Sequence, residues 1–201
     1  MQKNEDQVLK AYYRQWGSRR TQDKLRHRIH WILEQVSGKR VLDIGCSQGL
    51  VPLLLGRAGF EVFGLDVLAS PIEPAETHRS EESEAVQRRV RFAVEDIHTF
   101  ETDERFDCVV ASELLEHMVN PERTVQAVHG VLVDGGRLVV TVPFGLHPDT
   151  DHKQTLYLSD LHALLEPEFG VEQLDVMHKF ICCVATKRPS KSAVEGPGDP
   201  E

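Results

Sequence analysis

The sequence lacks any run of about 18 apolar residues, the length that a membrane-spanning helix requires. Its first ten residues, MQKNEDQVLK, contain no apolar core of the kind found in secretory signal peptides. No two of its four cysteines form a C-x-x-C pair, so neither a zinc site nor a disulfide framework is indicated. Cys46, Cys108, Cys182 and Cys183 all lie in or beside apolar segments. These features predict a protein of the reducing cytoplasm without membrane insertion.

Positive charge is also scarce. The formal net charge is -9, which argues against broad, nonspecific binding to nucleic acids or anionic membranes. A local basic patch, such as Arg88, Arg89 and Arg91, remains compatible with this total. Internal repeats are absent, and 201 residues of which 40% are hydrophobic suffice for one good-sized core. We therefore expect one main domain.

The segment VLDIGCSQGL at residues 41–50 is the most informative one present. An alternating apolar run leads into two glycines, and an apolar pattern with helical spacing follows at once, which predicts a strand, a tight loop and a helix. Pro52 falls in the first helical turn, where its missing N–H costs nothing, and Gly59 ends the helix. A glycine loop before a helix can bind a ligand through its backbone, because glycine allows the closest approach.

Two classes of ligand use such a loop. The dinucleotide pattern G-x-G-x-x-G, counted from Gly45, requires glycine where this chain has Ser47 and Leu50. The pattern present, D-x-G-C-x-x-G, resembles motif I of the class I S-adenosylmethionine-dependent methyltransferases. The resemblance implies that Asp43 orients the loop and the methionine amino group, and that the loop residues border the cofactor. These loop residues are Gly45, Cys46 and Gly49. A structural glycine turn in another α/β protein is the alternative.

Two further acidic residues end strands. The apolar run Phe60–Asp66 ends in Asp66, and Val67 follows it. Asp66 lies 21 residues after Gly45, about where nucleotide-binding sheets place a carboxylate for the ribose hydroxyls. A second run, Val90–Val94, precedes Asp96 and Ile97. The family resemblance implies that Asp96 reaches the adenine amino group and that Ile97 packs against the ring. A structural salt bridge for Asp66 and an exposed turn for Asp96 are the alternatives.

The remaining pattern follows the family in order. The turn L-x-x-G-G-x-L is matched at residues 132–138, between a helix at 125–133 and a strand at 137–142. The resemblance implies a Rossmann-like seven-stranded sheet, mostly parallel with the last strand antiparallel, flanked by helices. We expect a lid or cap of helices at residues 1–36, containing Tyr12, Tyr13 and Trp16, a methyltransferase domain at 37–188, and a disordered tail at 189–201. In the polar stretch 68–89 we expect one short helix, within 79–89.

Chemistry-bearing residues follow the fourth and fifth strands. Glu113-x-x-Glu116-His117 comes directly after the apolar strand 106–111, and on a helix these three side chains would share one face. His152, with His147 as an alternative, lies in the polar loop after the fifth strand. The set resembles two family branches: ubiquinone-pathway O-methyltransferases, and small-RNA 2′-O-methyltransferases in which two Glu and two His bind a divalent metal.

Three interpretations stay open. His117 or His152 acts as a general base without a metal, with Glu113 beside them and the cofactor. Alternatively, Glu113, Glu116, His117 and His152 hold a divalent metal that binds a vicinal diol. In the third, the glutamates only stabilise a helix N-terminus.

We predict a methyltransferase that uses S-adenosyl-L-methionine and methylates a hydroxyl of a small molecule or carbohydrate. Little of the chain lies outside the cofactor sheet, so a large partner such as nucleic acid is not expected. A metal-dependent RNA 2′-O-methyltransferase and a non-catalytic regulatory subunit with the same fold are the alternatives. The oligomeric state does not follow from the sequence.

Overall fold

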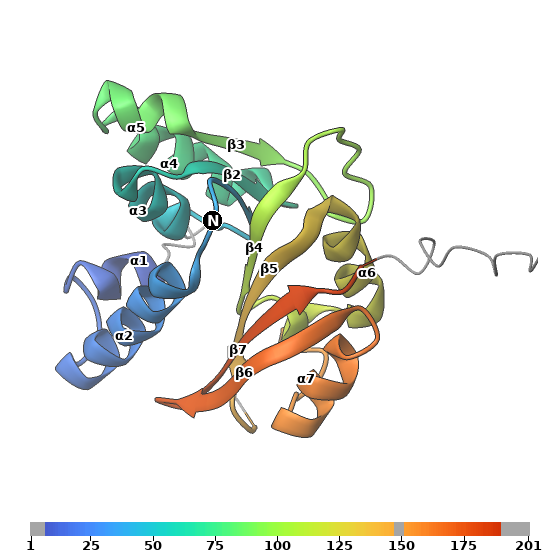
Figure 1. Cartoon of the computed structure of the whole chain (residues 1–201). Coiled ribbons are helices and arrows are strands. Elements are labelled where there is room, and N and C mark those ends of the chain that lie inside the picture. Colours follow the sequence, from blue (N-terminus) through green and yellow to red (C-terminus); the bar gives the residue numbers. More distant parts are fainter. Residues whose placement is uncertain (1–6, 147–150, 190–201) are drawn as a thin grey trace, which may run out of the picture.

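The computed structural model describes residues 7–146 and 151–189, which are built around a seven-stranded sheet (Figure 1). The strand order is β3-β2-β1-β4-β5-β7-β6. β7 is antiparallel to its neighbours β5 and β6, and the other neighbouring strands pair in parallel. The predicted fold class is confirmed. Residues 190–201 of the expected tail, and His147, lie outside the described residues.

The elements follow one another along the chain as α1 (Gln7–Tyr12), α2 (Arg19–Gln35), β1 (Arg40–Ile44), α3 (Leu50–Ala58), β2 (Glu61–Asp66), α4 (Ala69–Ser80), α5 (Glu84–Arg89), β3 (Val90–Val94), β4 (Phe106–Ser112), the 3-10 turn η1 (Leu115–His117), α6 (Pro121–Val131), β5 (Leu132–Pro143), α7 (Leu158–Leu165), β6 (Phe169–Met177) and β7 (Phe180–Lys187).

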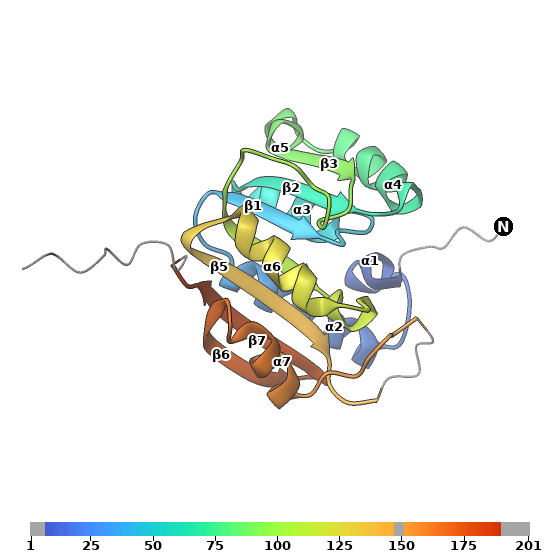
Figure 2. The same cartoon turned by 90° about the vertical axis from the view of Figure 1, so that its right-hand side faces the viewer.

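Helices cover both faces of the sheet. α1 to α5 lie on one face, and α6 and α7 lie on the other (Figure 1). Figure 2 shows the face with α6 and α7 from the front. Because side chains alternate along a strand, β4 sends Cys108 and Val110 into the core under α2 and α3. Val109 and Ala111 of the same strand enter the core under α6 and α7. None of the described helices is long and apolar enough to cross a membrane.

Helix α2 begins directly after Ser18. The side chain of Ser18 accepts the N–H of Thr21 at 3.2 Å and thereby caps the helix. Ile29 and Ile32, on the apolar face of this helix, are 2% and 0% exposed and pack in the core beside β1. The first helix is shorter than expected, since α1 ends at Tyr12.

The region 68–89 contains more helix than the sequence pattern predicted. α4 includes Pro71 and Pro74, which had suggested an irregular segment. Pro71 is the third residue of the helix, where the N–H has no partner within the helix in any case. Pro74 does remove one helical hydrogen bond. Burial of Ile72 and Ala75 against the rest of the protein offsets that loss.

Helix α6 starts earlier than predicted. Asn120 caps it by accepting the N–H of Arg123 at 3.1 Å, and Pro121 occupies its first position. The pair Asn120-Pro121 was the available signal. β5 then begins at Leu132 rather than at Arg137.

Candidate functional site

The glycine loop that joins β1 to α3 depends on left-handed backbone conformations. Gly45 and Gly49 have φ angles of 72° and 81°. A Cβ atom on Gly49 would lie 2.6 Å from the ring of Phe92, and one on Gly45 would lie 3.1 Å from the side chain of Leu114. The fold itself therefore requires both glycines, in addition to any clearance they give a ligand.

Asp66 braces this loop from the next strand. Its Oδ2 atom accepts the N–H of Ser47 at 3.1 Å, and its Oδ1 atom accepts the N–H of Leu68 at 3.0 Å. Its backbone carbonyl accepts the N–H of Glu95, at 2.9 Å, from the loop after β3. Asp66 thus joins the ends of β1, β2 and β3 through hydrogen bonds to backbone N–H groups, whereas the sequence had suggested a ribose contact or a salt bridge.

A pocket of about 340 Å³ opens at the carboxyl ends of β1 and β4. Seven predicted site residues line it: Asp43, Gly45, Cys46, Glu113, Glu116, His117 and His152. Others contribute from α1, α2 and β7, among them Val8, Lys24, Arg28 and Phe180. Five predicted cofactor residues do not line this pocket: Gly49, Asp66, Val67, Asp96 and Ile97. Of these, Val67 is 60% exposed and follows Asp66 on the open surface beyond β2.

Asp43 lies at the base of the pocket. It is 3% exposed, and burial raises the pKa of its carboxyl group to about 8, with a further contribution from the negative charge of Asp66. A buried carboxylate of this kind needs a positive partner in order to ionise. The pocket can therefore accept a cationic group at this position.

Glu113 departs from the predicted arrangement. We expected residues 113–117 to form one helical turn, but η1 starts at Leu115 and Glu113 has a left-handed φ of 55°. Its carboxylate pairs with Arg28 of α2 at 2.9 Å, and the Arg28 side chain is 4% exposed. Within the described residues, Oε1 of Glu113 and Nε of Arg28 have no hydrogen-bond partner.

Sequence reasoning missed Arg28. Its guanidinium stacks over the ring of Phe180 at 4.6 Å, and the ammonium group of Lys24 lies 4.1 Å from the same ring. A signal was present, because residue 28 falls on the apolar stripe formed by Leu25, Ile29 and Ile32. A charged residue on a buried helical face indicates a partner elsewhere in the fold.

Three of the four predicted metal ligands converge. Ligand atoms of Glu116, His117 and His152 all lie within 4.8 Å of one another, and Glu116 is 2% exposed. The rings of His117 and His152 meet edge to face with centroids 4.7 Å apart. Nδ1 of His117 lies 3.4 Å from the carbonyl oxygen of Asp151. A carbonyl only accepts, so Nδ1 is the donor, and in the neutral imidazole Nε2 then has the lone pair.

Hydrogen bonds to the backbone bring His152 to this place. The N–H of Lys153 donates to the carbonyl of Glu116 at 2.8 Å. The side-chain amide of Gln154 donates to the carbonyls of Leu115 and Met118, both at 3.1 Å. Residues 153 and 154 therefore attach the loop after β5 to η1, a role that the sequence pattern did not reveal.

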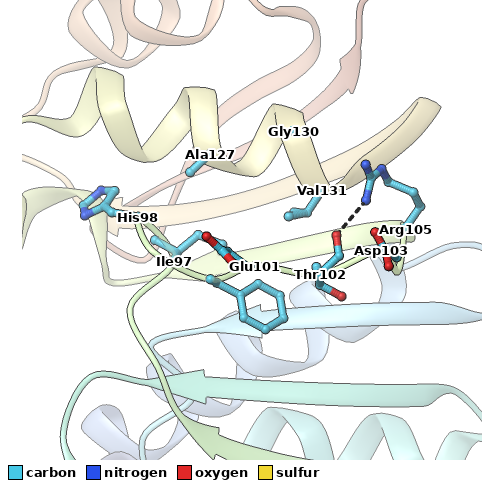
Figure 3. Close-up of a pocket in the computed structure, with 10 residues that line it drawn as sticks. Ile97, His98, Glu101, Thr102, Asp103, Arg105, Ala127, Gly130 and Val131 are labelled. Atoms are coloured by element: carbon cyan, nitrogen blue, oxygen red, sulfur yellow. Dashed lines mark hydrogen bonds between the residues drawn. The ribbon is translucent and has the colours of Figure 1, made fainter.

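A second hollow, of about 690 Å³, lies between residues 97–105 and the C-terminal half of α6 (Figure 3). Ile97 and His98 lie at one end of the hollow, and Thr102 and Arg105 lie at the other. There the side chain of Arg105 donates a hydrogen bond to the carbonyl of Thr102 at 3.1 Å. It is the larger of the two cavities, but it contains none of the glycine-loop or E-x-x-E-H residues. We therefore place the candidate active site in the smaller pocket.

Comparison with known proteins bears on this arrangement. Residues 16–178 match the family described as "Methyltransferase domain". The chain is 32% identical over 137 residues to a ubiquinone biosynthesis O-methyltransferase of Pseudomonas syringae pv. tomato, covering 65% of this chain and 58% of that protein. It is 40% identical over 108 residues to the mitochondrial ubiquinone biosynthesis O-methyltransferase of Rattus norvegicus, covering 53% and 31%. The chain thus spans less than two thirds of the length of these relatives.

Solved structures show the same fold at lower identity. The [4+2]-cyclase SpnF superposes with a TM-score of 0.74 at 18% identity, covering 84% of this chain and 83% of that one. The glycopeptide N-methyltransferase MtfA complexed with S-adenosyl-L-methionine gives 0.69 at 15% identity, covering 81% and 93%. The family match spans more than half of this chain. As the D-x-G-C-x-x-G loop predicted, the chain belongs to the class I S-adenosylmethionine-dependent methyltransferase family.

Proposed function

We propose that this chain transfers a methyl group from S-adenosylmethionine to a hydroxyl of a small molecule or carbohydrate. The observation that carries the proposal is the pocket in which the glycine loop meets His117 and His152. Its volume of about 340 Å³ suits a small acceptor group. Similarity to relatives named O-methyltransferases of ubiquinone biosynthesis supports oxygen as the atom methylated.

The amino acid end of the cofactor is a zwitterion, and the pocket presents a complementary ion pair. Arg28 would receive the carboxylate through its fork of donors, because its Nε still lacks a partner among the described residues. Glu113, through its Oε1 atom, and Asp43 would receive the ammonium group. The ribose diol and the adenine would then lie along Asp66 and Asp96, towards the open surface beyond β2.

The protein must also remove a proton from the acceptor. S-adenosylmethionine supplies a methyl group on a sulfonium, so the new oxygen–carbon bond forms as the carbon–sulfur bond breaks, leaving a neutral thioether. Nε2 of His117 would take the hydroxyl proton, because Nδ1 faces the Asp151 carbonyl. His152, against the same ring, is the second candidate base. Burial of the pocket walls helps to exclude water.

A metal-assisted version is the second candidate, and one observation favours it. Glu116, His117 and His152 offer one carboxylate and two imidazoles within 4.8 Å of one another, a donor set that suits manganese, zinc or magnesium. The Asp151 carbonyl would orient His117 as an outer partner. These residues fit a divalent ion, which would supply Lewis-acid polarisation of a hydroxyl or diol. Glu113 would become a fourth ligand of the ion only if its ion pair with Arg28 were broken.

Action on RNA and a purely regulatory role both fit this chain less well. An RNA 2′-O-methyltransferase would share the three ligands above, but the net charge of -9 and the small pocket favour a small acceptor. A non-catalytic subunit would not need Asp43, Glu113 and the histidine pair in one cavity. We further propose a reducing compartment such as the cytoplasm, because all four cysteines are free and buried.

Methyl transfer can be tested directly. Calorimetry with S-adenosylhomocysteine should show binding, and release of that product from S-adenosylmethionine should depend on an added hydroxylated aromatic or sugar acceptor. If the protein binds neither compound, the proposal is wrong. Activity that survives exhaustive EDTA treatment rules out the metal version. Activity lost to EDTA and restored by one divalent ion supports it.

Histidine variants separate the same two versions. His117→Gln and His152→Gln should both abolish activity and ion binding if a metal is held, because the site then needs all three ligands. If a histidine is the base, one variant should be severe and the other mild. His162→Gln, on the exposed side of α7, is a matched control that should leave activity unchanged.

A further inference from the structure

The carboxylate of Asp96 is held by the residue two positions later. Its Oδ1 atom accepts the backbone N–H of His98 at 2.9 Å and lies 3.2 Å from the ring nitrogen Nδ1 of His98. The other ring nitrogen, Nε2, lies 2.9 Å from the hydroxyl of Thr124, a fully buried residue of α6. Figure 3 shows His98 beside α6, at the end of the hollow opposite to Asp103 and Arg105.

The chemistry of the three groups fixes the direction of these hydrogen bonds. A carboxylate can only accept, so Nδ1 of His98 must donate to Asp96. In the neutral imidazole Nε2 is then an acceptor, and the Thr124 hydroxyl donates to it. The side chain of His98 is 18% exposed, so these contacts are largely shielded from water. Helix α6 therefore sets the orientation of the Asp96 carboxylate through His98.

Both donors from His98 use the same oxygen of Asp96. Within residues 7–146 and 151–189, the second oxygen, Oδ2, accepts no hydrogen bond. The Asp96 side chain is 47% exposed, so Oδ2 is accessible to a ligand on the surface beyond β2. One oxygen is thus occupied by the protein, and the other is oriented but available.

We propose that His98 is a positioning residue that directs Oδ2 of Asp96 toward the exocyclic amino group of the cofactor's adenine. This inference rests on the proposed function, in which Asp96 is the adenine contact. An amino group donates a hydrogen bond to a carboxylate oxygen. A keto oxygen at the same position would instead face the carboxylate oxygen, and neither of these two acceptors could donate to the other. A fixed Oδ2 therefore makes the site select a 6-amino purine over a 6-oxo purine.

Two probes that differ only at this position test the proposal: S-adenosylhomocysteine and its 6-oxo analogue S-inosylhomocysteine. By calorimetry the wild-type protein should prefer the first by about tenfold or more. His98→Leu removes the side-chain donor to Asp96, and His98→Gln moves it one carbon farther from the backbone than Nδ1, so both should reduce this preference to about twofold. His98→Asn should retain most of it, because its amide nitrogen takes the place of Nδ1. His98→Gln can still reach Thr124, which supports folding.

The preference, rather than the affinity, decides the outcome. If His98 were only structural, its loss would lower the melting temperature and weaken both probes by the same factor, and an unchanged preference would overturn the proposal. A loss in His98→Asn as large as in His98→Leu would overturn it as well. Asp96→Ala provides the reference. If this variant keeps the wild-type preference, Asp96 is not the adenine contact and the inference fails, while methyl transfer can stand. If the wild type binds neither probe, the proposed function fails first.

Discussion

At the scale of the residue, Asp43 links the pocket to the pH dependence of stability. Burial raises the pKa of its carboxyl group from 3.8 to about 8 in the folded protein. Between these values the folded state holds one more proton than the unfolded state, so stability falls as pH rises, by up to about 1.4 kcal/mol per pH unit. Urea unfolding of the ligand-free protein at pH 5, 6, 7 and 8 measures this slope.

Asp43→Asn is the matched variant for this prediction, because it keeps the shape of the side chain and cannot ionise. It should remove most of the downward slope between pH 5 and pH 8. Parallel stability curves for the two proteins would show that the carboxyl group is not protonated in the fold. A cationic ligand group at Asp43 should favour the ionised form, so S-adenosylhomocysteine should bind more tightly as pH rises toward 8.

Arg28 combines a structural and a binding role, and two variants can separate them. Arg28→Met leaves Glu113 partly buried without its partner and should cost about 3 kcal/mol of unfolding free energy. Arg28→Met combined with Glu113→Gln removes both charges, so most of the stability should return. The affinity for S-adenosylhomocysteine should stay low in both, because the donor for its carboxylate is gone. Recovery of affinity in the double variant would assign Arg28 a structural role alone.

At the scale of the element, Gln154 holds the loop after β5 against η1. Gln154→Leu removes two hydrogen bonds, which should cost about 1–3 kcal/mol. The carbonyl of Met118 loses its donor, whereas the carbonyl of Leu115 still accepts the N–H of Met118 at 3.2 Å. His152 should then separate from His117, and methyl transfer should fall. A local readout is the rate of tryptic cleavage after Lys153, which should rise. Gln173→Leu on β6 is the control, and equal cleavage rates in the two variants would contradict the prediction.

The lid expected at the N-terminus is a second prediction at this scale. Among Tyr12, Tyr13 and Trp16 only Tyr12 is buried, and its hydroxyl lies 3.1 Å from Nε2 of His30 in α2. Tyr13 and Trp16 are 44% and 41% exposed, and the residue of α1 that reaches the pocket is Val8. If α1 covers the cofactor, S-adenosylhomocysteine should slow tryptic cleavage after Lys10 and Arg14. Equal rates with and without the ligand would contradict a lid.

At the scale of the whole molecule, the fold buries every thiol. Burial is the largest cause of a raised pKa at each of the four cysteines, and it raises the pKa of Cys182 to about 11. Thiols that stay protonated and buried react slowly with disulfide reagents. Ellman's reagent should therefore detect no thiol in the native protein within minutes and four in denaturant. Rapid reaction of Cys46 alone would indicate that the pocket wall opens.

The sequence predicted the sheet well because its signals are local. Strand and helix positions follow from apolar spacing, and Gly45 and Gly49 indicate a loop with left-handed backbone conformations. Helix α4 was missed because Pro71 and Pro74 suppress its local signal, and only burial of Ile72 and Ala75 restores it. In this segment the local sequence pattern disfavours a helix, but tertiary packing stabilises one.

The candidate site was predicted only in part, and the reason is the same. The sequence by itself determined which residues stand at or near the strand ends: Asp43 in β1, the E-x-x-E-H group after β4, and His152 after β5. It also predicted the family, which the family match over residues 16–178 confirms. Only the tertiary structure decided their partners. Glu113 turns to Arg28, 85 residues away along the chain, because η1 begins too late to hold it beside Glu116. His152 reaches His117 because the side-chain amide of Gln154 donates to the carbonyls of Leu115 and Met118. Such pairings depend on contacts across the fold that residue spacing does not encode.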